Sequence, residues 1–153
     1  MQENIVDHVE EKLGYRFTNK ELLQTALTHK TYAFEARTPL EYNERLEFLG
    51  DSVLSFVIAE QLYGSNRYFS EGELTRRRAI CVNNNVLADV AIRLGIGPFL
   101  QLGKGEQKQE GGKNRTNLAN VLEAIIGALY LDSNLGTVRT FILEKIYTKE
   151  YQF

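Results

Sequence analysis

Residues 43 to 57, Asn-Glu-Arg-Leu-Glu-Phe-Leu-Gly-Asp-Ser-Val-Leu-Ser-Phe-Val, repeat their apolar side chains at the spacing of an amphipathic α-helix. At about 100° per residue, measured from Glu44, an arc from about 120° to about 220° holds Leu46, Leu49, Val53, Phe56 and Val57. We therefore expect a helix with this face in the hydrophobic core.

The flanking residues predict where this helix begins and ends. Thr38-Pro39-Leu40-Glu41 combines an N-cap residue, a proline for the first helical position and a capping-box glutamate, so we expect the helix to begin near Pro39 or a few residues later. Gly64 predicts its end. Gly50 lies in the middle, where glycine costs about 1 kcal/mol relative to alanine, and close approach of another backbone is the expected reason for it.

Three carboxylates lie on the face of this helix that points away from the core. Glu44, Glu47 and Asp51 fall within roughly 60° of one another. Carboxylates so aligned raise one another's pKa unless a cation lies among them or they face open water. A solvated helix face is the ordinary interpretation, and a site for a hard divalent cation is the alternative.

Phe48 lies only about 40° from Glu44, beside the acids and outside the apolar arc. An aromatic side chain in this place cannot reach the core of its own chain. It is either an exposed ring, which is common for single residues, or a ring that a second protein chain buries.

Residues 117 to 131 predict a second helix, strongly apolar, with Leu118, Leu122, Ile125, Ile126 and Leu129 on its core side. Asn120, Glu123 and Gly127 share the opposite stripe, and Glu123 is the lone charged residue of the run. A carboxylate in such a run needs a partner, and one that meets an acidic stripe needs a cation. Two facing helices would then offer a single metal ion four ligands, which are Glu47, Asp51, Asn120 and Glu123.

The stretch from Asn43 to Leu54, NERLEFLGDSVL, resembles the signature of the ribonuclease III family. Residues 26–32 (ALTHKTY), 70–76 (SEGELTR) and 122–128 (LEAIIGA) are also similar to that family, and the resemblance spans nearly the whole chain. It implies an all-α fold, the helical endonuclease domain of ribonuclease III, in a symmetric homodimer. It also implies Mg²⁺-dependent cleavage of double-stranded RNA that leaves short 3′ overhangs.

The resemblance also implies roles for individual residues. Asp51 and Glu123 correspond to the catalytic acids, and with Glu47 and the position of Asn120 they form the metal-binding set. Glu44 and Glu71 correspond to acids that line the catalytic valley, where substrate lies. Phe48 corresponds to the aromatic residue that the family inserts into its dimer partner.

Asn120 departs from the family, which usually has an aspartate three residues before the glutamate of the second helix. An amide oxygen can ligate a hard cation but brings no charge, and the affinity for such ions depends on ligand charge. Three hypotheses follow: an active Mg²⁺-dependent endoribonuclease, an RNA-binding homodimer in which Asn120 prevents cleavage, and a non-catalytic structural subunit of a ribonucleoprotein. The presence of Glu47, Asp51, Glu71 and Glu123 argues against the third.

The implied reaction is hydrolysis by metal-activated water, with Mg²⁺, or Mn²⁺ as its substitute, and with no small-molecule cofactor. The sequence offers little for other chemistry. Cys81 is the single cysteine and has no histidine near it in sequence, which argues against a thiol nucleophile. His29 is expected to make a structural hydrogen bond and His8 to be solvated, so zinc is not expected.

The length of 153 residues fits one domain, and 43% hydrophobic residues are enough for a core. The chain begins without a basic and apolar signal segment and has no membrane-length apolar run, so we expect a cytoplasmic protein that contacts no membrane. Its net charge of −2 would not by itself indicate nucleic acid. Basic residues do cluster, at 76–78 and again at Lys104, Lys108, Lys113 and Arg115, where solvated surface and phosphate contact both remain open.

The remaining segments also read as helices, with no alternating strand pattern. We expect helices over residues 5–13, from a capping box at Thr18 to Glu21, over 85–94, and over about 135–147, and another that begins after Ser70. Residues 103–115 are expected to form a mobile loop. We expect a single domain, 1–153, with no separate double-stranded-RNA-binding domain in this chain.

Overall fold

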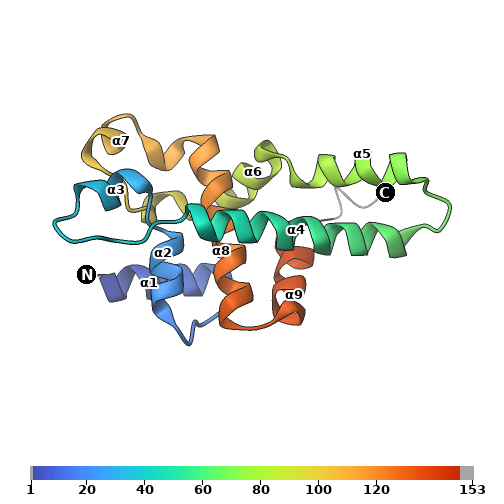
Figure 1. The fold of residues 1–153 in the computed structure, drawn as a ribbon, viewed down its shortest axis with the longest axis horizontal. Helices are drawn as coiled ribbons and strands as arrows, with labels where there is room; N and C mark the ends of the chain where they lie inside the picture. The colour runs from blue at the N-terminus through green and yellow to red at the C-terminus, as the bar shows by residue number, and fades with distance from the viewer. Residues whose placement is uncertain (1, 149–153) are drawn as a thin grey trace.

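The computed structural model describes residues 2–148, and these residues form helices with no strand among them, which confirms the all-α prediction (Figure 1). The first six α-helices are α1 Gln2–Leu13, α2 Lys20–Ala26, α3 Lys30–Glu35, α4 Glu44–Ser65, α5 Glu71–Val82 and α6 Asn84–Leu94. They are followed by the 3₁₀ turn η1 Gly97–Phe99, α7 Lys104–Lys108, the turn η2 Gly111–Lys113, α8 Arg115–Asp132 and α9 Leu135–Lys145.

The centre of the fold is the crossing of α4 and α8, the pair of helices in most extensive contact (Figure 1). Gly50 of α4 and Gly127 of α8 allow the two backbones to touch. A Cβ atom on Gly50 would overlap the carbonyl of Glu123, and one on Gly127 would overlap the carbonyl of Leu46. The expectation that Gly50 permits close backbone approach is therefore confirmed.

Helix α8 is the core of the molecule. All five apolar residues predicted for its core side are buried, and so is every residue from Val121 to Leu129. Helix α6 covers another side of α8, while α2 and α9 pack against it more lightly. Because so much of α8 is enclosed, any polar side chain that it carries needs a partner within the protein or a bound ligand.

Helix ends agree with the sequence where a local cap decides them. Ser70 Oγ accepts a hydrogen bond from Glu73 N at 3.2 Å, as its capping box predicts. Gly95 ends α6 in the left-handed conformation, with φ of 72°. Near residue 18 the prediction was one residue early, because the N-cap of α2 is Asn19, which accepts from Glu21 N.

Three expectations were wrong. The Thr38–Glu41 segment does not cap α4, which begins at Glu44, five residues after Pro39, and whose N-cap Asn43 makes no side-chain capping bond. Phe56, at the edge of the predicted apolar arc, is 52% exposed. Residues 103–115 are not simply a loop, since they form α7 and η2 and bury Gly111.

None of the helices that the structure describes is long and apolar enough to span a membrane. The predicted domain limits, residues 1 and 153, and the tail 149–153 lie outside the described residues.

Candidate active site

The α4–α8 crossing brings most of the predicted acidic residues together. Helix α4 carries Glu44, Glu47 and Asp51 along one side, and α8 carries Glu123 where the two backbones touch. Glu44 and Asp51 are exposed and Glu47 is half-buried, whereas Glu123 is only 7% exposed. A solvated helix face therefore describes Glu44 and Asp51, but not Glu123.

Glu123 has the most strongly shifted pKa of the acids in this cluster. Burial, a side-chain hydrogen bond with Asp51 and the negative charges of Asp51 and Glu47 raise its pKa to about 8. Two carboxyl groups share a hydrogen bond only when one of them holds a proton. In the absence of a cation, a proton on Glu123 therefore relieves the repulsion between the two helices.

The pKa of Glu47 is shifted by the same burial and neighbouring charges. Its pKa is raised, first by burial and then by the charges of Glu44 and Asp51, while Lys30 acts in the opposite direction. Asn120 lies beside it on α8. With its side-chain amide turned so that the nitrogen faces the neighbouring acceptors, that nitrogen is 3.3 Å from Glu47 Oε1 and 3.3 Å from the carbonyl oxygen of Thr116. Asn120 can therefore donate to both oxygens, which the side chain of an ionised aspartate could not do.

The cluster suits a hard cation in the chemistry of its ligands, though not in their present arrangement. Within residues 2–148, no three Asp, Glu, His or Cys side chains are gathered closely enough to form a ready-made metal site. The ligand atoms are nevertheless carboxylate and amide oxygens, which Mg²⁺ and Mn²⁺ prefer. A divalent cation would also reverse the repulsion that raises the pKa of Glu123 and Glu47.

Glu71 is not part of this cluster. It lies in the first turn of α5, where its carboxylate accepts a hydrogen bond from Thr75 Oγ1 at 2.9 Å. It borders a cavity of about 420 Å³ beside the C-terminal half of α4, together with Phe56, Glu60 and Tyr63. Within one chain, the structure joins Glu44, Glu47, Asp51, Asn120 and Glu123, and leaves Glu71 apart.

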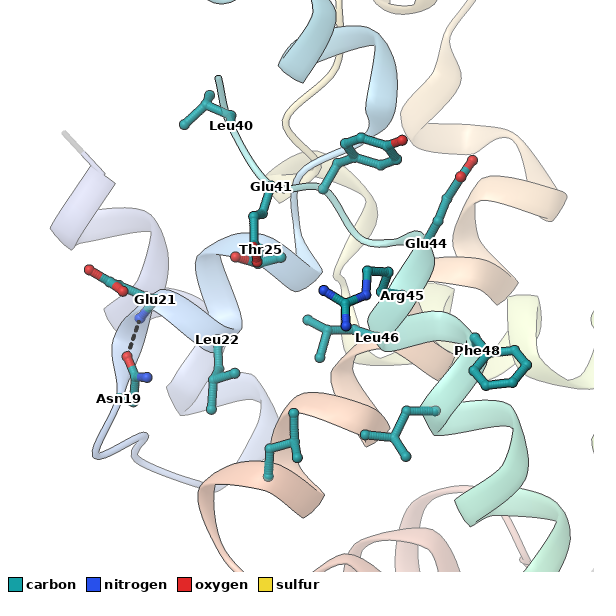
Figure 2. Close-up of a pocket in the computed structure, with 13 residues that line it drawn as sticks. Asn19, Glu21, Leu22, Thr25, Leu40, Glu41, Glu44, Arg45, Leu46 and Phe48 are labelled. Atoms are coloured by element: carbon teal, nitrogen blue, oxygen red, sulfur yellow. Dashed lines mark hydrogen bonds between the residues drawn. The ribbon is translucent and has the colours of Figure 1, made fainter. Parts of the chain in front are cut away.

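Phe48 projects into solvent with 79% of its surface exposed, which confirms that it does not reach the core of its own chain. Figure 2 shows it at one end of a groove between α4 and α2, with Leu22 and Thr25 on the opposite wall. This groove has a volume of about 980 Å³. Phe56 and Tyr63, 52% and 78% exposed, continue the apolar surface along the same helix.

The sequence interpretation missed a cation beside the acids. Lys30 Nζ lies 3.5 Å from Glu44 Oε1. The two residues are fourteen positions apart on different helices, so no helical spacing indicated the pair. Lys30 stood in a segment, 26–32, that resembles the family, and that was the available signal.

The two histidines and the cysteine behave as structural groups. His29 is the N-cap of α3 and its Nδ1 accepts from Thr31 N at 3.3 Å. Cys81 is buried, and burial raises the pKa of its thiol to about 11, far from the range of a reactive thiolate. His8 is exposed and stacks on Phe99, a contact that the sequence did not predict.

Comparisons with known proteins agree with this arrangement. Residues 19–150 match the family model described as Ribonuclease-III-like. The chain is 46% identical over 152 residues to Ribonuclease 3 of Buchnera aphidicola subsp. Schizaphis graminum, covering 99% of this chain and 64% of that protein. It is 49% identical over 140 residues to Ribonuclease 3 of Coxiella burnetii, covering 92% of this chain and 58% of the relative.

Solved structures show the same fold. The nuclease domain of ribonuclease III from Campylobacter jejuni, studied for flexibility in a region involved in dimer formation, superposes with a TM-score of 0.86 at 36% identity, covering 97% of this chain and 98% of that one. Dicer from Pichia stipitis superposes with a TM-score of 0.64 at 27% identity, covering 89% of this chain and 57% of Dicer. The chain spans about three fifths of the length of the two bacterial relatives compared above. On the combined match of sequence and fold, this chain belongs to the ribonuclease III-like family.

Proposed function

We propose that this chain is the nuclease domain of an endoribonuclease that hydrolyses double-stranded RNA with Mg²⁺, leaves short 3′ overhangs and acts in RNA processing. The observation that carries the proposal is the burial of Glu123, 7% exposed, at the point where α8 touches α4 and its acidic residues. A carboxyl buried against two other acids destabilises a fold unless it serves a ligand. The matches to proteins named Ribonuclease 3 support this chemistry.

Asp51 and Glu123 are the proposed catalytic residues, and with Glu47 and Asn120 they would hold the metal. A bound Mg²⁺ would supply an activated water and stabilise the departing 3′ oxygen. For this to occur, Glu123 must release its proton and Asp51 must exchange its hydrogen bond for the cation. Because Gly50 and Gly127 fix the two backbones, only side chains need to turn.

We also propose that the protein acts as a symmetric homodimer. Phe48, Phe56 and Tyr63 form an apolar stripe on α4 that the chain itself leaves exposed, and aromatic residues are enriched where proteins associate. The C. jejuni nuclease domain has a region involved in dimer formation, which supports this arrangement. Phe48 is then the residue inserted into the partner, and Glu44 and Glu71 line the valley that receives the substrate.

A second candidate function rests on Asn120. With its amide nitrogen turned toward Glu47, Asn120 would donate a hydrogen bond to that carboxylate and hold the cluster together in part without a metal. Asn120 also supplies one negative charge fewer than an aspartate. The alternative is a homodimer that binds double-stranded RNA and cuts it slowly or not at all.

The test is incubation of the protein with a long RNA duplex, first with Mg²⁺ and then with Mn²⁺, followed by analysis of product lengths and ends. We expect short duplexes with 3′ overhangs, no products with EDTA, and no products from Glu123→Gln. Glu11→Gln, at an exposed position on α1, is the matched control that should retain activity. Binding of the duplex with no shortened product under either metal would favour the second candidate.

The remaining parts of the proposal are a cytoplasmic location and no small-molecule cofactor.

A further inference from the structure

Lys30 is a cation at the rim of an acidic cluster. It occupies the first turn of α3, and its Nζ lies 3.5 Å from Glu44 Oε1. The positive charge of Lys30 also acts on Glu47, where it partly offsets the rise in pKa that burial and the neighbouring acids cause. Both partners of the ion pair are about half exposed, 50% for Lys30 and 51% for Glu44, so the amine faces solvent as well as the acids.

The backbone holds this lysine in place from three sides. His29 N donates to Gln101 O at 2.9 Å, and Gln101 N donates to Leu27 O at 2.8 Å. Asn43 N donates to Thr28 O at 2.9 Å, which ties the start of α4 to the start of α3. The approach of Lys30 to Glu44 is therefore built into the path of the chain.

Stability gives little reason for such a pair. An ion pair with both side chains half in water contributes about 0 to 1 kcal/mol. The cluster that it borders carries four carboxyl groups, in a protein of net charge −2. RNA is a polyanion, so a cation that faces both the acids and solvent is most useful when a phosphate approaches.

We propose that Lys30 is a substrate-positioning residue that contacts a phosphate of the RNA backbone at the edge of the acidic cluster. The inference rests on the proposed function and goes beyond it by naming a basic residue for the substrate. Lys30 is shared between two anions: it pairs with Glu44 when the site is empty and turns to the phosphate when RNA is bound.

The first experiment measures binding of a short RNA duplex in EDTA, where cleavage cannot interfere, over a range of KCl concentrations. We expect Lys30→Met to weaken binding about 3- to 10-fold at low salt and to reduce the slope of log affinity against log salt by about one, the loss of one phosphate contact. Lys30→Arg, which keeps the charge, should restore most of the slope. Lys12→Met, at an exposed lysine on α1, is the matched control and should change neither quantity.

The second experiment titrates Mg²⁺ into the RNA-free protein by calorimetry. Removing a positive charge beside Glu44 and Glu47 should leave Mg²⁺ affinity unchanged or raise it about 2- to 5-fold, while RNA binding falls. A lysine that served only to hold Glu44 for the metal would give the opposite result, weaker Mg²⁺ binding at unchanged RNA affinity. The two measurements therefore separate a substrate contact from a structural role.

Circular dichroism establishes that each variant is folded, and Lys30→Gln provides a second neutral variant should Lys30→Met lose structure. Wild-type protein that binds duplex while both neutral variants keep its affinity and salt slope would overturn the inference and leave the proposed function standing. Wild-type protein that neither binds nor cuts the duplex would overturn both. A reduced slope that Lys30→Arg restores would support the inference.

Discussion

Helix α4 has an acidic face and an aromatic face, and they differ in which side chains are buried. Near the acidic face a charged group is buried, whereas on the aromatic face large apolar rings are exposed. On the side toward α8, Asp51 and Glu47 act electrostatically on Glu123, a carboxyl that is 93% buried. On the side toward solvent, Phe48 and Tyr63 leave nearly four fifths of their surface in water. A charge in the core and large aromatic rings outside it both lower the stability of an isolated chain. Under the proposed function, a cation would stabilise one face and a second protein chain would stabilise the other.

The largest expected effect is on the acidic face. Replacing Glu123 by Gln keeps the size of the side chain and removes its charge, so the proposed site would lose a metal ligand. We expect the rate of duplex cleavage to fall by more than about 100-fold, or about 2.7 kcal/mol in activation free energy. Gel analysis of a labelled duplex measures it, and activity near that of wild type would show that this face is not catalytic.

The second largest effect is expected at the backbone contact between α4 and α8. Gly50→Ala places a methyl group against the backbone of Glu123, where neither helix can easily move. We expect a loss of about 3 kcal/mol or more in the free energy of unfolding, measured with urea. Gly64→Ala, where an added Cβ meets nothing within 4 Å, is the control and should be neutral or stabilising. Equal stability of the two variants would contradict the close crossing.

The aromatic face is tested by Phe48→Ala. A ring inserted into a partner is the kind of residue that dominates an interface, so we expect the dimer dissociation constant to rise by about 10-fold or more. Sedimentation at several concentrations measures this constant. Ile92→Ala, at an exposed apolar residue on α6, is the control for a loss of apolar surface elsewhere. A change of the same size in both variants would argue against an interface on α4.

The stability of the metal-free protein should also depend on pH because of Glu123. The folded-state pKa of Glu123 is about 8 and its ordinary value is 4.5, so the folded protein holds a proton that the unfolded chain releases. The stabilisation from this proton is complete below pH 4.5 and is lost as the pH rises to about 8. We expect unfolding in EDTA to show wild type losing about 1 to 3 kcal/mol more than Glu123→Gln between pH 5 and pH 9. Identical pH profiles would contradict the burial of an ionisable group at this position.

Asn120→Asp should have the smallest effect of the five. The change adds a negative charge beside Glu47 and removes the amide hydrogen bond. We expect Mg²⁺ to bind several-fold more tightly, cleavage to rise, and the metal-free protein to lose about 1 kcal/mol of stability. Calorimetry and unfolding in EDTA measure the first and last of these, and equal metal affinity and activity in both proteins would refute the prediction.

Parts of the fold differ in how far the sequence predicted them. The core side of α8 followed from helical periodicity alone, and so did the exposure of Phe48. The start of α4 did not follow from Thr38–Glu41, because the N–H of Asn43 is bound to Thr28 O and this tertiary contact overrides the local cap. Helical periodicity predicts a buried Phe56, but this residue lies at the edge of the apolar arc, where α5 and the adjacent cavity decide its exposure.

Within the candidate site, periodicity on two helices predicted that Glu47, Asp51 and Glu123 could face one another, and the glycine at position 50 indicated how closely. Helical periodicity could not predict the ion pair of Lys30 with Glu44, which depends on a turn between α3 and α4. Nor could it place Glu71, since the distance between the start of α5 and the acids depends on the length of α4. These are tertiary relationships with no local signature.

The most direct test of the account is a crystal structure of the protein soaked in Mn²⁺, with anomalous scattering measured at the α4–α8 crossing. We predict a manganese peak between Asp51 and Glu123, with carboxylate oxygens of both residues bound to the ion and no hydrogen bond between the two carboxyl groups. Carboxyl groups that remain hydrogen-bonded to each other at saturating Mn²⁺, with no peak between them, would contradict it.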